Sequence, residues 1–136
     1  MASQSLVYFV GGSFFEKKET LDIGYQAGKG VACVISKHLT RCMFYGMMWR
    51  DDATGEWHGN LTDLYGVSRI RVIQFNDAAL IFEKFYEDRG PDEGILYRFT
   101  WNGECWDGAW SYMSYSKPGG TTKCLLVPIP AQMFHT

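Results

Sequence analysis

The sequence predicts an all-β fold, an antiparallel up-and-down meander that closes into a β-barrel of about eight or more strands. Between residues 55 and 115, short apolar-rich runs alternate with turn sequences such as ND, RGPDEG and NG. Asn102-Gly103 is a strong signal for a β-hairpin with a type I′ turn, because that turn needs positive φ at both central residues. Aromatic residues make up 16% of the chain. A meander this rich in aromatic side chains favours a barrel or sandwich with a hollow interior.

The first 50 residues carry less regular signals. We expect a first strand over Leu6 to Val10, ended by the glycines at positions 11–12. Residues 14–26 fit either a helix or a strand, since their aromatic residues are nearly consistent with helical spacing. Residues 31–36 form a β-branched run typical of a buried strand. Arg41 to Arg50 is apolar on both faces, which predicts a strand with one face on the core and the other under a lid or partner.

Alternation defines which residues share a face along each strand of the meander. The sequence leaves open which of the two faces points into the lumen. The more apolar faces are Trp57, Gly59 and Leu61; Leu80, Phe82, Lys84 and Tyr86; Ile95, Tyr97, Phe99 and Trp101; and Trp106, Gly108, Trp110 and Tyr112. A last strand is expected from Thr122 to Ile129, ended by flanking prolines.

Composition and charge limit the classes of protein and partner. The 136 residues predict a single domain over residues 1–136, with 46% hydrophobic and 21% charged residues as in soluble globular proteins. A net charge of −2 provides no basic field, so we expect neither duplex nucleic acid nor a membrane as a partner. The apolar run Leu6 to Val10 is too short for the core of a signal peptide, which predicts a cytoplasmic location.

The cysteines predict no metal site. Cys33, Cys42, Cys105 and Cys124 lie far apart, whereas a structural zinc site normally includes a close pair of ligands. In a reducing compartment they are expected to be small buried hydrophobic residues. Cys33 and Cys42 would be able to pair across neighbouring strands in an exported chain. No motif implies a cofactor.

Two fragments, Gly55-Glu-Trp57-His-Gly59 and Trp106-Asp-Gly108-Ala-Trp110-Ser-Tyr112, repeat a pattern of glycine next to tryptophan. They resemble the Gly-x-Trp strands of small calycin-type barrels, the avidin-like and lipocalin-like proteins, over residues 55–115. The resemblance implies the barrel fold only. The Gly-x-Trp that lipocalins carry near the amino terminus is absent here, since Phe14 stands where tryptophan is expected, and no biotin-binding residue can be aligned.

A barrel of this kind is predicted to hold a small ligand in its lumen. Lys84 lies between Phe82 and Tyr86 on the more apolar face of its strand, where a lone ammonium is costly unless it is paired. We interpret Lys84 as an anchor for a carboxylate or phosphate, so that Lys84→Met would leave the fold intact and weaken an anionic ligand. The residues predicted to bind the ligand are Tyr45, Trp57, Arg71, Phe82, Lys84, Tyr86, Tyr97, Arg98, Trp110 and Tyr112.

Structural interpretations compete with each of these assignments. Lys84 would face outward if Phe82 and Tyr86 packed on a partner. Tryptophans near glycine would plug a barrel end instead of stacking on a ligand, and these are Trp57, Trp106 and Trp110. The arginines would form an exterior ladder with carboxylates instead of gripping an anion, and the residues concerned are Arg69, Arg71, Arg98, Glu83 and Glu87.

Signals for catalysis are weak. The three histidines are scattered, and no nucleophile or phosphate-loop motif is present. Carboxylates able to serve as a general acid are Glu56, Asp63, Glu83 and Glu87, and nothing selects a pair among them. The sequence therefore predicts a small-molecule-binding barrel for an apolar or aromatic ligand, with or without an anionic group. The alternatives are a barrel enzyme, an isomerase or hydrolase, and a non-catalytic protein that oligomerises through runs such as Met43 to Trp49.

Overall fold

A computed structural model describes residues 6–17, 33–35, 39–90, 93–114 and 118–130 of the chain. These residues form nine strands: β1 (Val7–Lys17), β2 (Cys33–Ile35), β3 (Leu39–Arg50), β4 (Trp57–Asp63), β5 (Gly66–Phe75), β6 (Ala79–Tyr86), β7 (Ile95–Trp101), β8 (Trp106–Tyr112) and β9 (Pro118–Pro128). The described residues contain no helix that is long and apolar enough to cross a bilayer.

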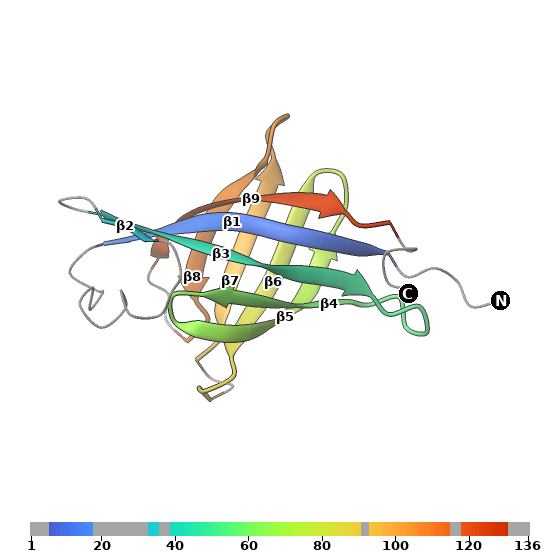
Figure 1. Cartoon of the computed structure of the whole chain (residues 1–136), viewed down its shortest axis with the longest axis horizontal. Coiled ribbons are helices and arrows are strands. Elements are labelled where there is room, and N and C mark those ends of the chain that lie inside the picture. The colour runs from blue at the N-terminus through green and yellow to red at the C-terminus, as the bar shows by residue number, and fades with distance from the viewer. Residues whose placement is uncertain (1–5, 18–32, 36–38, 91–92, 115–117, 131–136) are drawn as a thin grey trace.

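The sheet closes because β1 pairs with both β9 and β3, in addition to the hairpin neighbours that run from β3 to β9. All of these pairings are antiparallel, so eight strands form a closed barrel, and β2 adds to the edge of β3. In Figure 1, β9, β1, β3 and β4 run along the long axis, and β6, β7 and β8 cross behind them at a steep angle. The predicted fold class, an all-β antiparallel barrel, is confirmed.

The interior is filled by one alternating set of side chains from every strand of the barrel. On β6, Phe82, Lys84 and Tyr86 are buried, which settles the face that the sequence left open. On β3, the even-numbered residues Phe44 and Met48 are buried while the odd-numbered residues of the same strand are more exposed. The two apolar faces of β3 therefore separate into a core face and an outer face.

The expectation that β1 ends at residues 11–12 is wrong, since the strand continues to Lys17. Gly12 lies between β3 and β9, and a Cβ atom there would collide with the carbonyl oxygen of Lys123 and with the ring of Phe44. A glycine in a strand often marks a close approach of a neighbouring backbone. Gly12 thus makes room for the Phe44 ring and does not end the strand. The undecided segment 14–26 is strand up to residue 17, and residues 18–26 lie outside the described residues.

The turn at Asn102-Gly103 joins β7 and β8 as predicted, but it is not type I′. Gly103 has a φ of 98°, and among the described residues no residue other than glycine has positive φ. The connection is a loop over residues 102–105, with Asn102 N donating to Cys105 O at 3.1 Å. The side-chain oxygen of Asn102 accepts from the backbone N–H groups of Glu104 and Cys105, each at 2.9 Å. This side-chain turn replaces the second positive-φ residue that a two-residue hairpin would need.

Candidate functional site

A buried ion pair lies inside the barrel, behind the β4–β5 turn. The Lys84 ammonium is 2.7 Å from Asp63 Oδ2, and both side chains are 0% exposed. Lys84 Nζ also donates to the Tyr97 hydroxyl at 2.9 Å, and the Tyr86 hydroxyl donates to Asp63 Oδ2 at 2.7 Å. The other oxygen of Asp63 accepts from the backbone N–H of Tyr65 at 2.8 Å. Both oxygens of the carboxylate are therefore engaged.

Three aromatic rings surround the same ammonium group. Lys84 Nζ lies 4.6 Å from the ring centroid of Tyr86, 4.9 Å from that of Tyr97 and 5.1 Å from that of Phe14. Cations at these distances are attracted by the negative face of an aromatic ring. Lys84 points inward as the apolar-face interpretation predicts, but Asp63 already neutralises it. The expectation was that Lys84→Met leaves the fold intact. We now expect this variant to be destabilised, because the change would leave Asp63 buried without its cation.

The hydroxyl group of Tyr86 resists ionisation. Burial raises the pKa of Tyr86 well above its ordinary value of 10.0, and the negative charge of Asp63 raises it further. Arg89 acts in the opposite direction as a smaller effect. The hydroxyl of Tyr86 consequently stays a hydrogen-bond donor to Asp63 far into the alkaline range.

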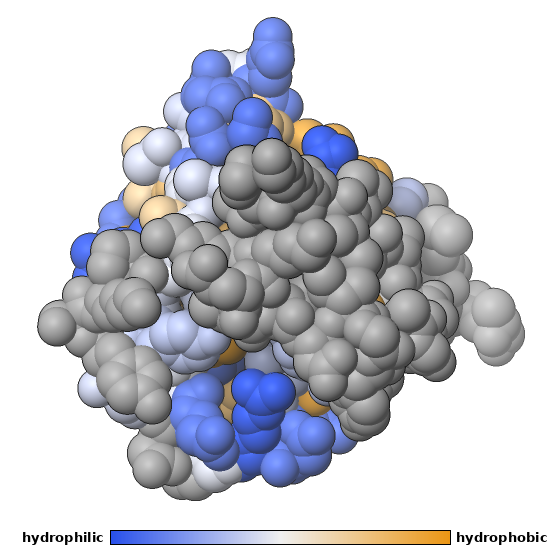
Figure 2. Space-filling model, turned by 90° about the vertical axis from the view of Figure 1, so that its left-hand side faces the viewer, coloured by the Kyte–Doolittle hydropathy of each residue, from blue (hydrophilic) through white to orange (hydrophobic). Residues whose placement is uncertain are grey.

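A cavity of about 170 Å³ opens beside this network, and we call it the inner pocket. It is lined by aromatic rings, one isoleucine and one arginine: Phe14, Tyr65, Tyr86, Arg89, Ile95, Tyr97, Trp110 and Tyr112. Trp110 is oriented by its Nε1–H, which donates to the carbonyl of Phe15 at 3.1 Å. Figure 2 views the molecule from this side, and hydrophilic side chains gather at its lower edge, where Figure 1 places the loop after β6.

Arg89, in the loop after β6, contributes the cation of the inner pocket. Its guanidinium carbon is 4.8 Å from the ring centroid of Tyr86 and 5.7 Å from that of Tyr65. Its side chain is 36% exposed, and its Nε is 4.0 Å from the Asp88 carboxylate. The guanidinium thus lies on the aromatic wall while part of it remains accessible from solvent.

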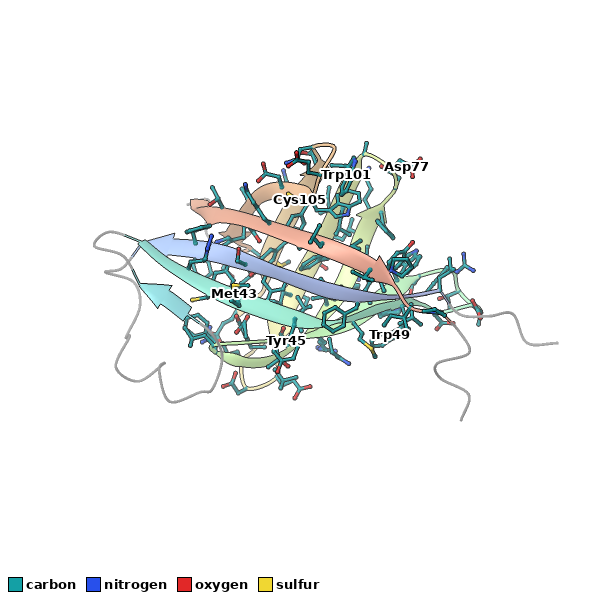
Figure 3. All side chains as sticks on the ribbon, turned by 45° about the horizontal axis from the view of Figure 1, so that its top comes forward. Met43, Tyr45, Trp49, Asp77, Trp101 and Cys105 are labelled. Atoms are coloured by element: carbon teal, nitrogen blue, oxygen red, sulfur yellow. The ribbon has the colours of Figure 1, made fainter. Side chains whose placement is uncertain are left out.

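The part of the barrel interior opposite the inner pocket is closed by packed aromatic rings. Trp57 lies 5.7 Å from Tyr8 and 5.2 Å from Phe75, and Phe75 lies 5.9 Å from Trp106, measured between ring centroids. The interpretation of Trp57 and Trp106 as plugs fits this packing. Outside the plug is an open hollow whose lining includes Asp77 and Trp101, both labelled at this rim in Figure 3.

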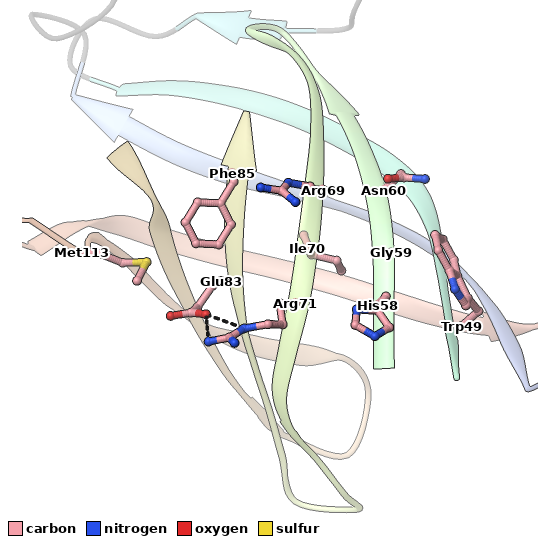
Figure 4. A pocket seen from close by; sticks show the side chains of 10 residues that line it. All are labelled: Trp49, His58, Gly59, Asn60, Arg69, Ile70, Arg71, Glu83, Phe85 and Met113. Atoms are coloured by element: carbon pink, nitrogen blue, oxygen red, sulfur yellow. Dashed lines mark hydrogen bonds and ion pairs between the residues drawn. The ribbon is translucent and has the colours of Figure 1, made fainter. Parts of the chain in front are cut away.

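A second cavity lies on the outer face of the barrel, across β3, β4, β5 and β6; we call it the outer groove. It has a volume of about 620 Å³ and is lined by Trp49, His58, Gly59, Asn60, Arg69, Ile70, Arg71, Glu83, Phe85 and Met113. Figure 4 shows Arg71 and Glu83 pointing toward each other from neighbouring strands, with Arg71 Nη2 2.7 Å from Glu83 Oε1. The interpretation of Arg71 as part of an exterior ladder with Glu83 agrees with this pair.

The structure separates the ten residues predicted to bind a ligand into four groups. Four line the inner pocket: Tyr86, Tyr97, Trp110 and Tyr112. Lys84 and Phe82 lie deeper in the core, and Trp57 packs in the plug. The assignment of the remaining three to the lumen is wrong, because they point outward from their strands: Tyr45, Arg71 and Arg98. Whether any of the ten binds a ligand stays a prediction.

Sequence reasoning did not assign four residues of this region to the ligand site: Phe14, Asp63, Tyr65 and Arg89. Asp63 carried a usable signal, because it continues the alternation of Gly59 and Leu61 and so belongs to the interior face of β4. A carboxylate on an interior face is the natural partner for a lysine on another. Arg89 had no such signal, since it lies in a loop whose path only the folded barrel defines.

Comparisons of the chain with protein families, curated proteins and solved structures found no match. The closed antiparallel barrel is consistent with the calycin-type fold that the glycine-tryptophan strands resemble. Among the described residues, no group of three or more His, Cys, Asp or Glu side chains is placed to hold a metal ion.

Proposed function

We propose that the protein binds a small aromatic carboxylate, or a molecule of similar size and charge, in the inner pocket. The observation that carries the proposal is the combination of an aromatic-lined cavity of about 170 Å³ with an arginine at its wall. An apolar cavity of roughly 150 Å³ is large enough for benzene. Ligand sites typically combine such apolar walls with a few polar groups that orient the ligand.

The anionic group is assigned to Arg89 and not to Lys84. The Lys84 ammonium already has a carboxylate partner in Asp63 at 2.7 Å, whereas the ion pair that Arg89 forms within the described residues, with Asp88, is 4.0 Å long. A guanidinium binds a carboxylate through two parallel hydrogen bonds, which also fixes the orientation of the ring. Tyr86 and Tyr97 connect the pocket to the buried pair, so a ligand there would contact rings that the pair holds in place.

The test uses benzoate and its uncharged analogue benzamide, with tryptophan fluorescence as the signal. We expect benzoate at millimolar concentration to change the emission of Trp110, and Trp110→Phe to remove this change. Arg89→Gln should weaken benzoate about tenfold, or about 1.4 kcal/mol, and leave benzamide unchanged. Arg98→Gln is the matched control, because Arg98 is exposed on the outer face. Equal effects of the two arginine variants, or no response to benzoate, would contradict the proposal.

An enzyme is less well supported by the same geometry. Among the described residues, Asp63 is the carboxylate inside the barrel, and its oxygens accept from Lys84, Tyr86 and the backbone of Tyr65. A general acid or base must reach the proton that it transfers. Asp63 does not line the inner pocket.

A second candidate function, self-association, is favoured by the outer face of β9, β1 and β3. Large apolar side chains are exposed there in cross-strand register: Phe9, Met43, Tyr45, Met47, Leu125 and Val127. Contiguous exposed apolar patches of this kind typically mark an interface. Gly11 lies within this face and has no side chain to project from it. The same face of a second copy would therefore be able to pack flat against it. Light scattering should then find a dimer that Phe9→Lys converts to a monomer, and a monomeric parent protein would overturn this candidate.

A further inference from the structure

Glu83 is a largely buried residue on the outer wall of the barrel, and its side chain is 12% exposed. Arg71 donates to it twice, from Nε at 3.0 Å and from Nη2 at 2.7 Å, and both bonds end on Oε1. Within the described part of the chain, Oε2 of Glu83 accepts no hydrogen bond. A buried polar atom without a donor is costly and is rare in native structures. The second oxygen of Glu83 therefore defines a position in the outer groove where a hydrogen-bond donor of a ligand would be stabilised.

The groove around this oxygen combines cations with apolar walls. Arg69 lies on the same face of β5 as Arg71, with its guanidinium carbon 5.9 Å from the ring centroid of Phe85. Phe85 and Met113 supply apolar surface near Glu83 (Figure 4). Among the described lining residues, two arginines face one glutamate, so positive groups outnumber negative ones. A matching ligand carries an N–H donor, an anionic group and an apolar part.

We propose that the outer groove binds a free α-amino acid with a large apolar or aromatic side chain. Its ammonium donates to Oε2 of Glu83, and its carboxylate is held by Arg69 and by the side of Arg71 that does not face Glu83. Charge-assisted hydrogen bonds of this kind are among the strongest in proteins. The side chain of the ligand lies on the apolar wall formed by Phe85 and Met113. This site is separate from the inner pocket and does not depend on the function proposed for that pocket.

Calorimetric titration of the whole protein with L-phenylalanine tests the inference. Two analogues each remove one charge: N-acetyl-L-phenylalanine lacks the ammonium, and L-phenylalaninamide lacks the carboxylate. We expect L-phenylalanine to bind and each analogue to bind at least about tenfold more weakly, since each loses a charged hydrogen bond. Equal binding of L-phenylalanine and the N-acetyl analogue, or no binding of L-phenylalanine at millimolar concentration, would overturn the proposal.

Variants locate the site on the barrel. Glu83→Gln keeps the size of the side chain and should weaken L-phenylalanine about tenfold, because the neutral amide attracts the ammonium less strongly. Glu87→Gln is the matched control, since Glu87 is exposed just beyond the end of β6. Arg98→Gln changes an exposed arginine that lines neither cavity and should leave this affinity unchanged, and a loss equal to that of Glu83→Gln would overturn the outer site. If Glu83→Gln fails to fold, the analogue series on the parent protein still decides.

Discussion

Lys84 Nζ and Asp63 Oδ2 lie 2.7 Å apart in the interior, although the two residues belong to strands that are not neighbours. β5 separates β4 from β6, so the two side chains meet inside the barrel and not along a shared edge. The pair is neutral overall and is enclosed by aromatic rings. It therefore makes the interior polar at one point without offering a free charge to a ligand.

Lys84→Met should destabilise the protein by about 3–5 kcal/mol, because it leaves the buried Asp63 carboxylate without its cation. Urea denaturation measures the free energy of unfolding directly. The double variant Lys84→Met with Asp63→Leu should recover most of the loss, since replacing both charges by apolar groups is often neutral or stabilising. A single Lys84→Met variant as stable as the parent would show that the pair is not formed in solution.

The stability should fall at alkaline pH, and Tyr86 should account for part of the fall. A tyrosine in the unfolded chain ionises near pH 10, and the pKa of Tyr86 in the folded state lies well above that value. Its contribution is therefore fully present below about pH 10 and is lost as the pH rises from there through the folded pKa. Tyr86→Phe should lose less stability than the parent between about pH 8 and about pH 11, measured by denaturation at each pH. Tyr45→Phe, which changes an exposed tyrosine, should behave as the parent does.

Gly12→Ala should destabilise the barrel by about 1–3 kcal/mol, the usual scale for overpacking. The added Cβ would meet the Phe44 ring and the Lys123 carbonyl, and Phe44 is itself held in the core. Gly11→Ala is the matched control one residue earlier, because the nearest atom to a Cβ there is a ring carbon of Phe9 at 3.6 Å. Thermal denaturation of the two variants side by side gives the comparison. Similar midpoints would mean that β1 does not approach β9 and β3 as closely as described.

Gly103→Val should destabilise the protein by about 1–3 kcal/mol, because a β-branched residue is strained at positive φ. The φ of Gly103 is 98°, and the position that a Cβ would take has no atom within 4 Å to cause a steric clash. The effect thus reports backbone strain alone. Gly103→Asn should be milder, since asparagine adopts positive φ more readily. Chemical denaturation that finds both variants as stable as the parent would place Gly103 at negative φ.

Much of the barrel could be predicted from local sequence patterns. The alternation Phe82, Lys84, Tyr86 correctly placed three residues on one face of β6, because side chains of a strand alternate whatever the strand pairs with. Turn residues also located the connection between β7 and β8 at Asn102-Gly103, although the loop extends to residue 105. The turn type was wrong because the Asn102 side chain forms hydrogen bonds that a list of preferred dipeptides does not describe. Gly12 was misread for a related reason, since a strand glycine and a turn glycine look alike until the neighbouring strands are known.

The sequence by itself determined the antiparallel meander, the pairing of consecutive strands and the residues that share each face, since these depend on periodicity and on turns between neighbours in the chain. Only the tertiary structure decided which face is inside, where Asp63 meets Lys84, and which cation lies by the inner pocket. Those features depend on the closure of β1 between β9 and β3, which brings together residues far apart in the sequence. Two arginines illustrate this dependence on closure. Arg71 pairs with Glu83 on the outer wall, whereas Arg89 lies on aromatic rings of the inner pocket. Barrel geometry assigns these two positions, and no local pattern distinguishes them.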